Sequence, residues 1–253
     1  MGITLASISD WATPHLEFRN MRRKLLKRLA VTTLVTGAFV VIISSMPAAA
    51  AVAPTVVGWG LNNPRQLSLT SDGVLLVAEA GKGGSKCEGT GEQKSCVGTS
   101  GAISAFFQPS VANKQFPIRV VKDLVSSAGP DGTFAVGSNG VSMRKFLNGT
   151  MFIQETYAPA AAVPSGVDGS TLGKLLYAWS GNKPSVASNV SAYEIAHDPD
   201  GQGADSNPYA VLDLGKRRLV ADAAANTVFN VWPDGKISVY HVFPNVTTKE
   251  CTT

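Results

Sequence analysis

The chain has few residues of the types that metal sites and nucleophilic triads require. It contains three cysteines and three histidines among 253 residues. The histidines, His15, His197 and His241, form no metal-ligand spacing, and no HxxxH, CxxC or GxSxG pattern is present. Without a positioned histidine, a serine triad has little support. The sequence therefore names no reaction and favours a binding protein over an enzyme.

An excess of one charge sign is also missing once the N-terminus is set aside. The whole chain has 22 Lys and Arg residues against 18 Asp and Glu residues, a formal charge of +4. Residues 1–50 hold six of the basic and two of the acidic residues, which leaves 16 of each after residue 50. A neutral mature chain has no basic field to attract nucleic acid or a membrane surface. We therefore expect no nucleic-acid partner.

A long apolar run occurs near the N-terminus and has the features of a targeting segment. The basic segment 21–28 precedes an uncharged, mainly apolar run over 29–43, and the alanine-rich stretch 44–53 follows. These are the three parts of a secretory signal peptide. The apolar run is about 15 residues long, short of the ~20 that span a membrane. We predict that residues 1–50 form an N-terminal extension and a signal helix, and that the mature protein is extracellular or periplasmic. In the alternative, an uncleaved signal peptide would be its sole membrane contact.

Residues 51–253 are expected to form one β domain, because a strand pattern recurs about 144 residues apart. An Asn-Pro pair, at 63–64 and again at 207–208, begins an alternating strand in both places. A turn containing Gly follows, and a second apolar strand ends in Glu79 or in Asp222. A repeat of small β units is typical of a propeller or another repetitive sheet.

The last unit gives the clearest strand pattern. Strands are expected at 218–221, 226–231 and 237–242, with an Asp-Gly turn at 234–235 that suits a tight hairpin. With the strand after Pro208, they make four antiparallel strands in about 40 residues, which is one propeller blade. At 40–45 residues a blade, the mature chain corresponds to between four and five blades. A helical turn is expected at 191–197.

At these motifs the chain resembles the ScyD/ScyE family of secreted proteins. The matching segments keep their order over about residues 56–244, and they are 60–67, 77–84, 129–132, 192–194, 205–209 and the two-cysteine loop between Gly84 and Gly98. The resemblance implies an NHL-like propeller of six four-stranded blades. Family members run longer than this chain, and the stretch 133–170 departs from the pattern, so an incomplete propeller is expected here. The resemblance implies little about activity.

The recurring polar residues define a candidate binding face. In a propeller blade, the loop before the innermost strand and the end of the second strand emerge on the same face. That geometry places Asn63, Glu79, Asn207 and Asp222 together on the top face, where a protein partner or small-molecule ligand would bind. Arg65 is a further candidate binding residue. The alternative is a metal-dependent hydrolase of the gluconolactonase type, in which amide and carboxylate oxygens hold a divalent ion. Because the acids recur once per unit, capping of local turns is the favoured role for Glu79 and Asp222.

Two further groups of residues are candidates for a structural or metal-binding role. Asp198, Asp200 and Asp205 alternate with glycines in a way that could wrap Ca²⁺, although a solvated Asp/Gly turn is the favoured interpretation. No other cofactor is expected. Export favours disulfides, and Cys87 and Cys96 lie in one loop, so we predict that they pair and leave Cys251 unpaired.

Overall fold

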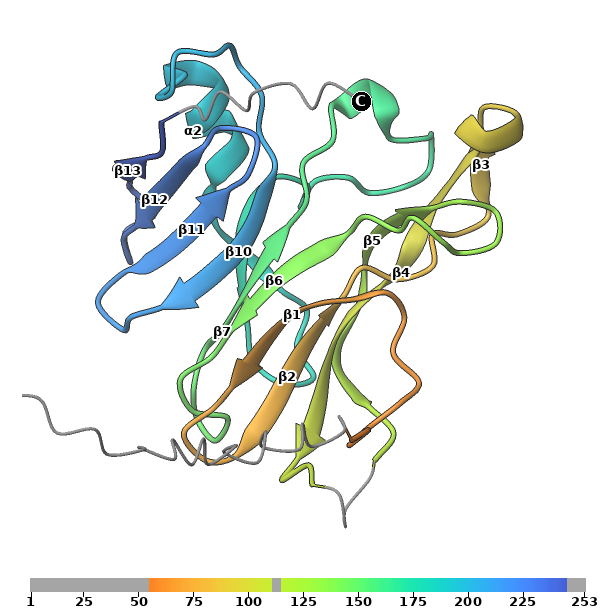
Figure 1. Cartoon of the computed structure of the whole chain (residues 1–253), viewed down its shortest axis with the longest axis vertical. Coiled ribbons are helices and arrows are strands. Elements are labelled where there is room, and N and C mark those ends of the chain that lie inside the picture. The colour runs from red at the N-terminus through yellow and green to blue at the C-terminus, as the bar shows by residue number, and fades with distance from the viewer. Residues whose placement is uncertain (1–54, 111–114, 245–253) are drawn as a thin grey trace, which may run out of the picture. The chain divides into compact units, whose positions relative to one another are not determined.

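The computed structural model describes residues 55–110 and 115–244. The predicted signal peptide and Cys251 lie outside the described residues. The described part is mostly β-strand, arranged in three antiparallel sheets (Figure 1), which confirms the all-β class. No helix in this part is long and apolar enough to cross a membrane.

Each sheet is built on four strands that follow one another in space. The first sheet has the order β1 (Pro64–Leu69), β2 (Val74–Glu79), β4 (Ser95–Phe107) and β3 (Lys86–Glu88), with β5 (Ile118–Ala128) paired to β4. The second runs β6 (Ser138–Ser142), β7 (Met151–Glu155), β8 (Lys174–Ala178) and β9 (Ser185–Asn189). The third runs β10 (Pro208–Asp213), β11 (Arg218–Asp222), β12 (Thr227–Val231) and β13 (Ile237–Val242). The described residues also contain three short helices: η1 (Gly91–Gln93) and η2 (Ala160–Ala162), which lie within the first and second sheets' connections, and α2 (Val190–His197), which leads from the second sheet to the third.

Local sequence explains why these strands turn where they do. Gly73 and Gly235 both have φ of 82°, which glycine adopts without steric cost, and they close the β1–β2 and β12–β13 turns. The expected helical turn is α2, which Asn189 caps by accepting a hydrogen bond from the Ala192 N–H at 3.0 Å. All four strands of the third sheet were expected from the sequence, the first and the last of them from an alternating pattern.

The core lies on both faces of the second sheet. One apolar cluster joins it to the first sheet, through residues that include Leu76, Ile103, Met151 and Ile153. A second cluster joins it to the third sheet and includes Phe152, Leu175, Val211, Val220 and Phe229. The second sheet is therefore packed between the other two, and burial of these side chains is the main force that holds the three sheets together.

The innermost strands β1, β6 and β10 lie next to one another and run in the same direction. Asn139 and Ser142 of β6 bond to the backbones of Pro208 and Asp213 of β10, at 3.4 and 2.9 Å, so residue numbers rise together along the two strands. The side-chain amide of Gln66 in β1 bonds both the N–H and the C=O of Val211, at 3.1 and 2.8 Å. Polar side chains thus satisfy backbone groups at the inner strand edges.

The sequence-based count of four to five units is wrong for the described residues. The innermost strands begin at residues 64, 138 and 208, so one sheet takes about 70 residues rather than 40–45. The difference arises because β4 and β5 are 13 and 11 residues long and because long connections, such as 156–173, separate other strands. The three sheets do not close into a ring within the described part of the chain.

Candidate functional site

The second strand of every sheet ends in an acidic residue that stands opposite the first residue of the innermost strand. The three register pairs are Pro64–Glu79, Ser138–Glu155 and Pro208–Asp222. Next to each pair, the residue after the acid donates its backbone N–H to the carbonyl of the residue before the innermost strand, at 2.9–3.0 Å. These bonds run from Ala80 to Asn63, from Thr156 to Gly137 and from Ala223 to Asn207. Because the innermost strands run in the same direction, all three acids lie at one end of the sheets, which we call the acid end.

Glu79 is fully buried, and both of its carboxylate oxygens have partners. Oε1 accepts a hydrogen bond from the hydroxyl of Ser104, and Oε2 accepts one from the backbone N–H of Asn62. Arg119 donates to the same Oε2 at 2.9 Å and forms an ion pair with it. A buried carboxylate needs such partners, because burial without them is costly.

Asp222 occupies the same position in the third sheet but relies on the backbone. Its Oδ1 accepts hydrogen bonds from the N–H groups of Asn207, Ala224 and Ala225 at 2.7, 3.2 and 3.2 Å. Its Oδ2 accepts from the hydroxyl of Ser206 at 2.7 Å. The turn-capping interpretation predicts such bonds from nearby backbone N–H groups for Asp222. Glu79 also accepts one bond from a backbone N–H, that of Asn62.

Glu155 is the third acid, and it was missed from the sequence. Its Oε1 accepts a hydrogen bond from Ser138 at 2.6 Å, whereas its buried Oε2 has no partner among the described residues. Burial raises the pKa of Glu155 from 4.5 to about 7, and the bond from Ser138 only partly opposes this effect. The signal that could have identified it is the apolar segment 151–153, which ends in an acid just as the strands before Glu79 and Asp222 do.

The other residues expected on the binding face also lie at the acid end. Asn63 has a left-handed backbone with φ of 50°, and its amide donates to the carbonyls of Gly81 and Gly132, both at 2.8 Å. Arg65 donates to the carbonyl of Ala135. Asn207 bonds Asp222 and Ala223 through its backbone. The structure thus brings these residues to one end, but the contacts it shows for them are internal. Their role in ligand binding stays a prediction.

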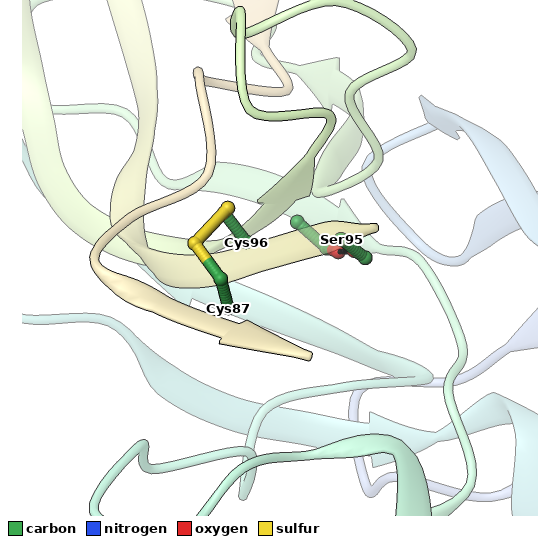
Figure 2. The surroundings of a disulfide bond; sticks show 4 residues. Cys87, Ser95 and Cys96 are labelled. Atoms are coloured by element: carbon green, nitrogen blue, oxygen red, sulfur yellow. Dashed lines mark hydrogen bonds between the residues drawn. A yellow bond between two sulfur atoms is a disulfide. The ribbon is translucent and has the colours of Figure 1, made fainter. Parts of the chain in front are cut away.

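A disulfide-linked hairpin projects at the acid end. β2 pairs with β4 only from Ala102 onward, so the first half of β4 extends beyond the sheet and pairs with β3 and β5 (Figure 1). Cys87 of β3 stands directly opposite Cys96 of β4, and the two form a disulfide with an S–S distance of 2.04 Å (Figure 2), as predicted. Next to it, the hydroxyls of Ser95 and Ser127 are 2.5 Å apart and share a hydrogen bond.

A cavity of about 320 Å³ lies between this hairpin and the connection after β7. The hairpin contributes Glu88, Gln93, Ser95 and Val97; β5 contributes Val125 and Ser127. Residues between 156 and 172 form the opposite wall, and most of them are alanine, valine or leucine. The cavity therefore combines a mainly apolar wall with polar side chains of the hairpin and one hydroxyl pair, and small-ligand sites usually have such a mixture.

The three aspartates expected to wrap Ca²⁺ surround the loop after α2. Asp198 accepts a hydrogen bond from the N–H of Gly203 at 3.2 Å. Asp200 accepts from the N–H of Gln202 at 3.1 Å and from the amide of Asn226 at 2.9 Å, and these bonds lower its pKa. Asp205 donates its own N–H to Glu194 at 3.4 Å. The bonds of Asp198 and Asp200 are those of a polar turn, and the Ca²⁺ role stays a prediction.

Glu194 of α2 is a second buried acid that sequence reasoning missed. Its Oε1 accepts the bond from Asp205, and its buried Oε2 has no partner among the described residues. Desolvation raises the pKa of Glu194, and the negative charges of Asp222, Asp198 and Asp200 raise it further. Within residues 55–110 and 115–244, no three His, Cys, Asp or Glu side chains are grouped so that they could hold a metal ion.

Comparisons of the sequence with family models and with curated proteins add no relative to this description. No protein-family model matches the chain, and no curated protein matches its sequence. The fold and site define an all-β protein with three stacked antiparallel sheets and a disulfide-linked hairpin at their acid end. Membership of the ScyD/ScyE family stays a prediction from the motifs.

Proposed function

We propose that the chain is a secreted binding module of the ScyD/ScyE type and that its sheets are consecutive blades of an NHL-like propeller. The ligand or protein partner contacts the acid end. The observation that carries this proposal is the cavity beneath the Cys87–Cys96 hairpin. It joins apolar walls to the Ser95–Ser127 hydroxyl pair at the end of the sheets where propellers commonly bind their ligands.

The bonding of the acids favours binding over hydrolysis. In a gluconolactonase-type enzyme, inward carboxylates and amides from different blades would share one divalent ion. Here the oxygens of Glu79 are taken up by Ser104, Asn62 and Arg119. Those of Asp222 are taken up by its own turn and by Ser206. The resting geometry of both acids is that of a structural cap, so no observation favours the hydrolase as a second candidate.

A fragment screen by NMR on the purified protein tests the proposal. Small ring compounds that carry a hydroxyl group should shift the methyl signals of Val97, Val125 and Leu172. Val163 lines the cavity and is half-buried, so Val163→Trp should fill the space and abolish those shifts. Val239→Trp, on the exposed strand β13, is the matched control and should leave them unchanged.

Two results would contradict the binding proposal. One is the absence of any fragment whose shifts map to the cavity walls. The other is binding that persists in Val163→Trp, because it would place the site elsewhere. Lactone hydrolysis that requires a divalent ion and is lost on substitution of Glu79 or Asp222 would instead support the enzyme.

A further inference from the structure

A second cleft lies between the second and third sheets, at the end opposite the acids. Its volume is about 460 Å³, within the range of small-ligand sites. Phe152, Leu175 and Val231 are its buried lining and belong to the apolar cluster between the two sheets. Met151 pairs with Ala178 and Arg218 pairs with Val231, so the cleft lies where β7 and β11 begin rather than where they end. It is therefore separate from the cavity at the acid end.

Arg218 places a partly desolvated cation in this cleft. Only 15% of its side chain is exposed, and its guanidinium carbon lies 3.9 Å from the ring centre of Phe152. Arg218 forms an ion pair with Asp213, but the Oδ1 of Asp213 is 3.7 Å from Nε, which is too far for a hydrogen bond. Nε is buried without a hydrogen-bond partner in the described part of the chain, and no hydrogen bond from the other guanidinium nitrogens is found there either. A guanidinium in this state gains from an anion that accepts its N–H groups.

Exposed aromatic rings stand at the mouth of the same cleft. Trp179 and Trp232 are 46% and 38% exposed, although indole rings of this size are usually well buried. Tyr177 packs edge-to-face on Trp179 with ring centres 5.7 Å apart and holds it in place. Arg217 stacks over Trp232 at 5.9 Å and fixes that ring in a similar way. Rigid, exposed aromatic rings offer flat surfaces on which the C–H face of a six-membered ring can lie.

The remaining lining groups are polar and suit a hydroxylated ligand. Thr150 and Asp234 both border the cleft, and Asp234 is paired with Lys236 at 3.2 Å. They can donate to and accept from ring hydroxyl groups. We propose that this cleft binds an acidic sugar of the uronate class, with its carboxylate on Arg218 and its ring face on Trp179 and Trp232. The proposal does not rest on the function assigned to the acid end.

Titration of the purified protein with sodium D-glucuronate, followed by tryptophan fluorescence and calorimetry, tests the proposal. Binding should be saturable, and D-glucose, which lacks the carboxylate, should bind at least about tenfold more weakly. Sodium benzoate has the carboxylate and a flat ring but no ring hydroxyls, and it should also bind more weakly. Stronger binding of benzoate than of glucuronate would overturn the sugar assignment, and equal binding of glucose and glucuronate would overturn the role of Arg218.

Matched variants locate the binding site. Arg218→Met keeps the packing on Phe152 and removes the charge, and it should weaken glucuronate binding at least about tenfold. Trp179→Ala changes an exposed residue and is the second test variant if Arg218→Met fails to fold. It should also weaken glucuronate binding about tenfold. Trp59→Ala is the control, because Trp59 is 43% exposed and lies outside the cleft. No saturable glucuronate binding, or equal losses in Trp179→Ala and Trp59→Ala, would refute the proposal.

Discussion

The buried acid Glu155 should make the protein less stable as the pH rises. Its carboxyl is fully buried, with one hydrogen bond from Ser138 and one oxygen that has no partner in the described part of the chain. Burial raises its pKa from 4.5 to about 7, so the folded protein binds this proton more tightly than the unfolded chain does. Stability from this group is therefore fully present below pH 4.5 and is lost as the pH rises through about 7.

The size of the effect follows from the difference between the two pKa values. At about 1.4 kcal/mol per pKa unit, it corresponds to a loss of about 3 kcal/mol in the free energy of unfolding between about pH 4 and pH 8. Glu155→Gln keeps the shape of the protonated acid but cannot ionise. The variant should be about 3 kcal/mol more stable than the parent near pH 8, and within about 1 kcal/mol of it near pH 4.

Urea unfolding of both proteins across this pH range is the assay. The difference between parent and variant removes the contributions of other titrating groups, including Glu194, whose pKa is also raised. If the two proteins lose stability in parallel as the pH rises, the pKa of Glu155 is the same in the folded and unfolded states and the reasoning is wrong. A Ser138→Ala variant should raise the pKa of Glu155 further and steepen the pH dependence, because the bond from Ser138 favours the ionised form.

Three further predictions concern the acid end. Asp222→Ala should lower the free energy of unfolding by about 2 kcal/mol, because it leaves the N–H groups of Asn207, Ala224 and Ala225 without their acceptor; an unchanged urea midpoint would contradict the capping role. The Cys87–Cys96 disulfide closes only a short loop, so its reduction should lower the free energy of unfolding by at most about 2–3 kcal/mol, with faster hydrogen exchange confined to the hairpin. Global loss of protection would show that the bridge holds the whole fold. A chelator should leave the Tm unchanged, whereas a drop that Asp222→Ala abolishes would support a metal site.

The sequence predicts strands well where short-range chemistry determines them. The third sheet follows from two alternating strands, an apolar strand that ends in an acid and an Asp-Gly turn, and α2 was expected as a helical turn. The sequence does not reveal that β5 joins the first sheet through β4, because this pairing is formed between segments that carry no shared pattern. The sequence also does not predict that one sheet takes about 70 residues, since the length of a loop depends on the residues that the loop contacts in the fold.

The candidate sites also divide into those that a local sequence pattern predicts and those that depend on tertiary packing. Glu79, Asp222 and the cysteine pair could be identified because each belongs to a local pattern. The cleft could not, because Trp179 and Trp232 are far apart in sequence and meet only when the second and third sheets pack together. The raised pKa of Glu155 has the same origin: burial by a neighbouring sheet is a tertiary effect that no local pattern contains.

The three acids show how a structural requirement can be separated from a functional one. Each stands opposite the first residue of an innermost strand and accepts at least one local hydrogen bond there. The remaining contacts of the carboxylate differ. It meets Arg119 in the first sheet and a set of backbone N–H groups in the third, whereas in the second sheet its other oxygen has no partner among residues 55–110 and 115–244. A group that held a ligand would need one defined partner set, whereas a cap needs only an acceptor in the right place. Function should therefore be sought in features that occur once, namely the disulfide hairpin and the cleft around Arg218, rather than in the position that every sheet repeats.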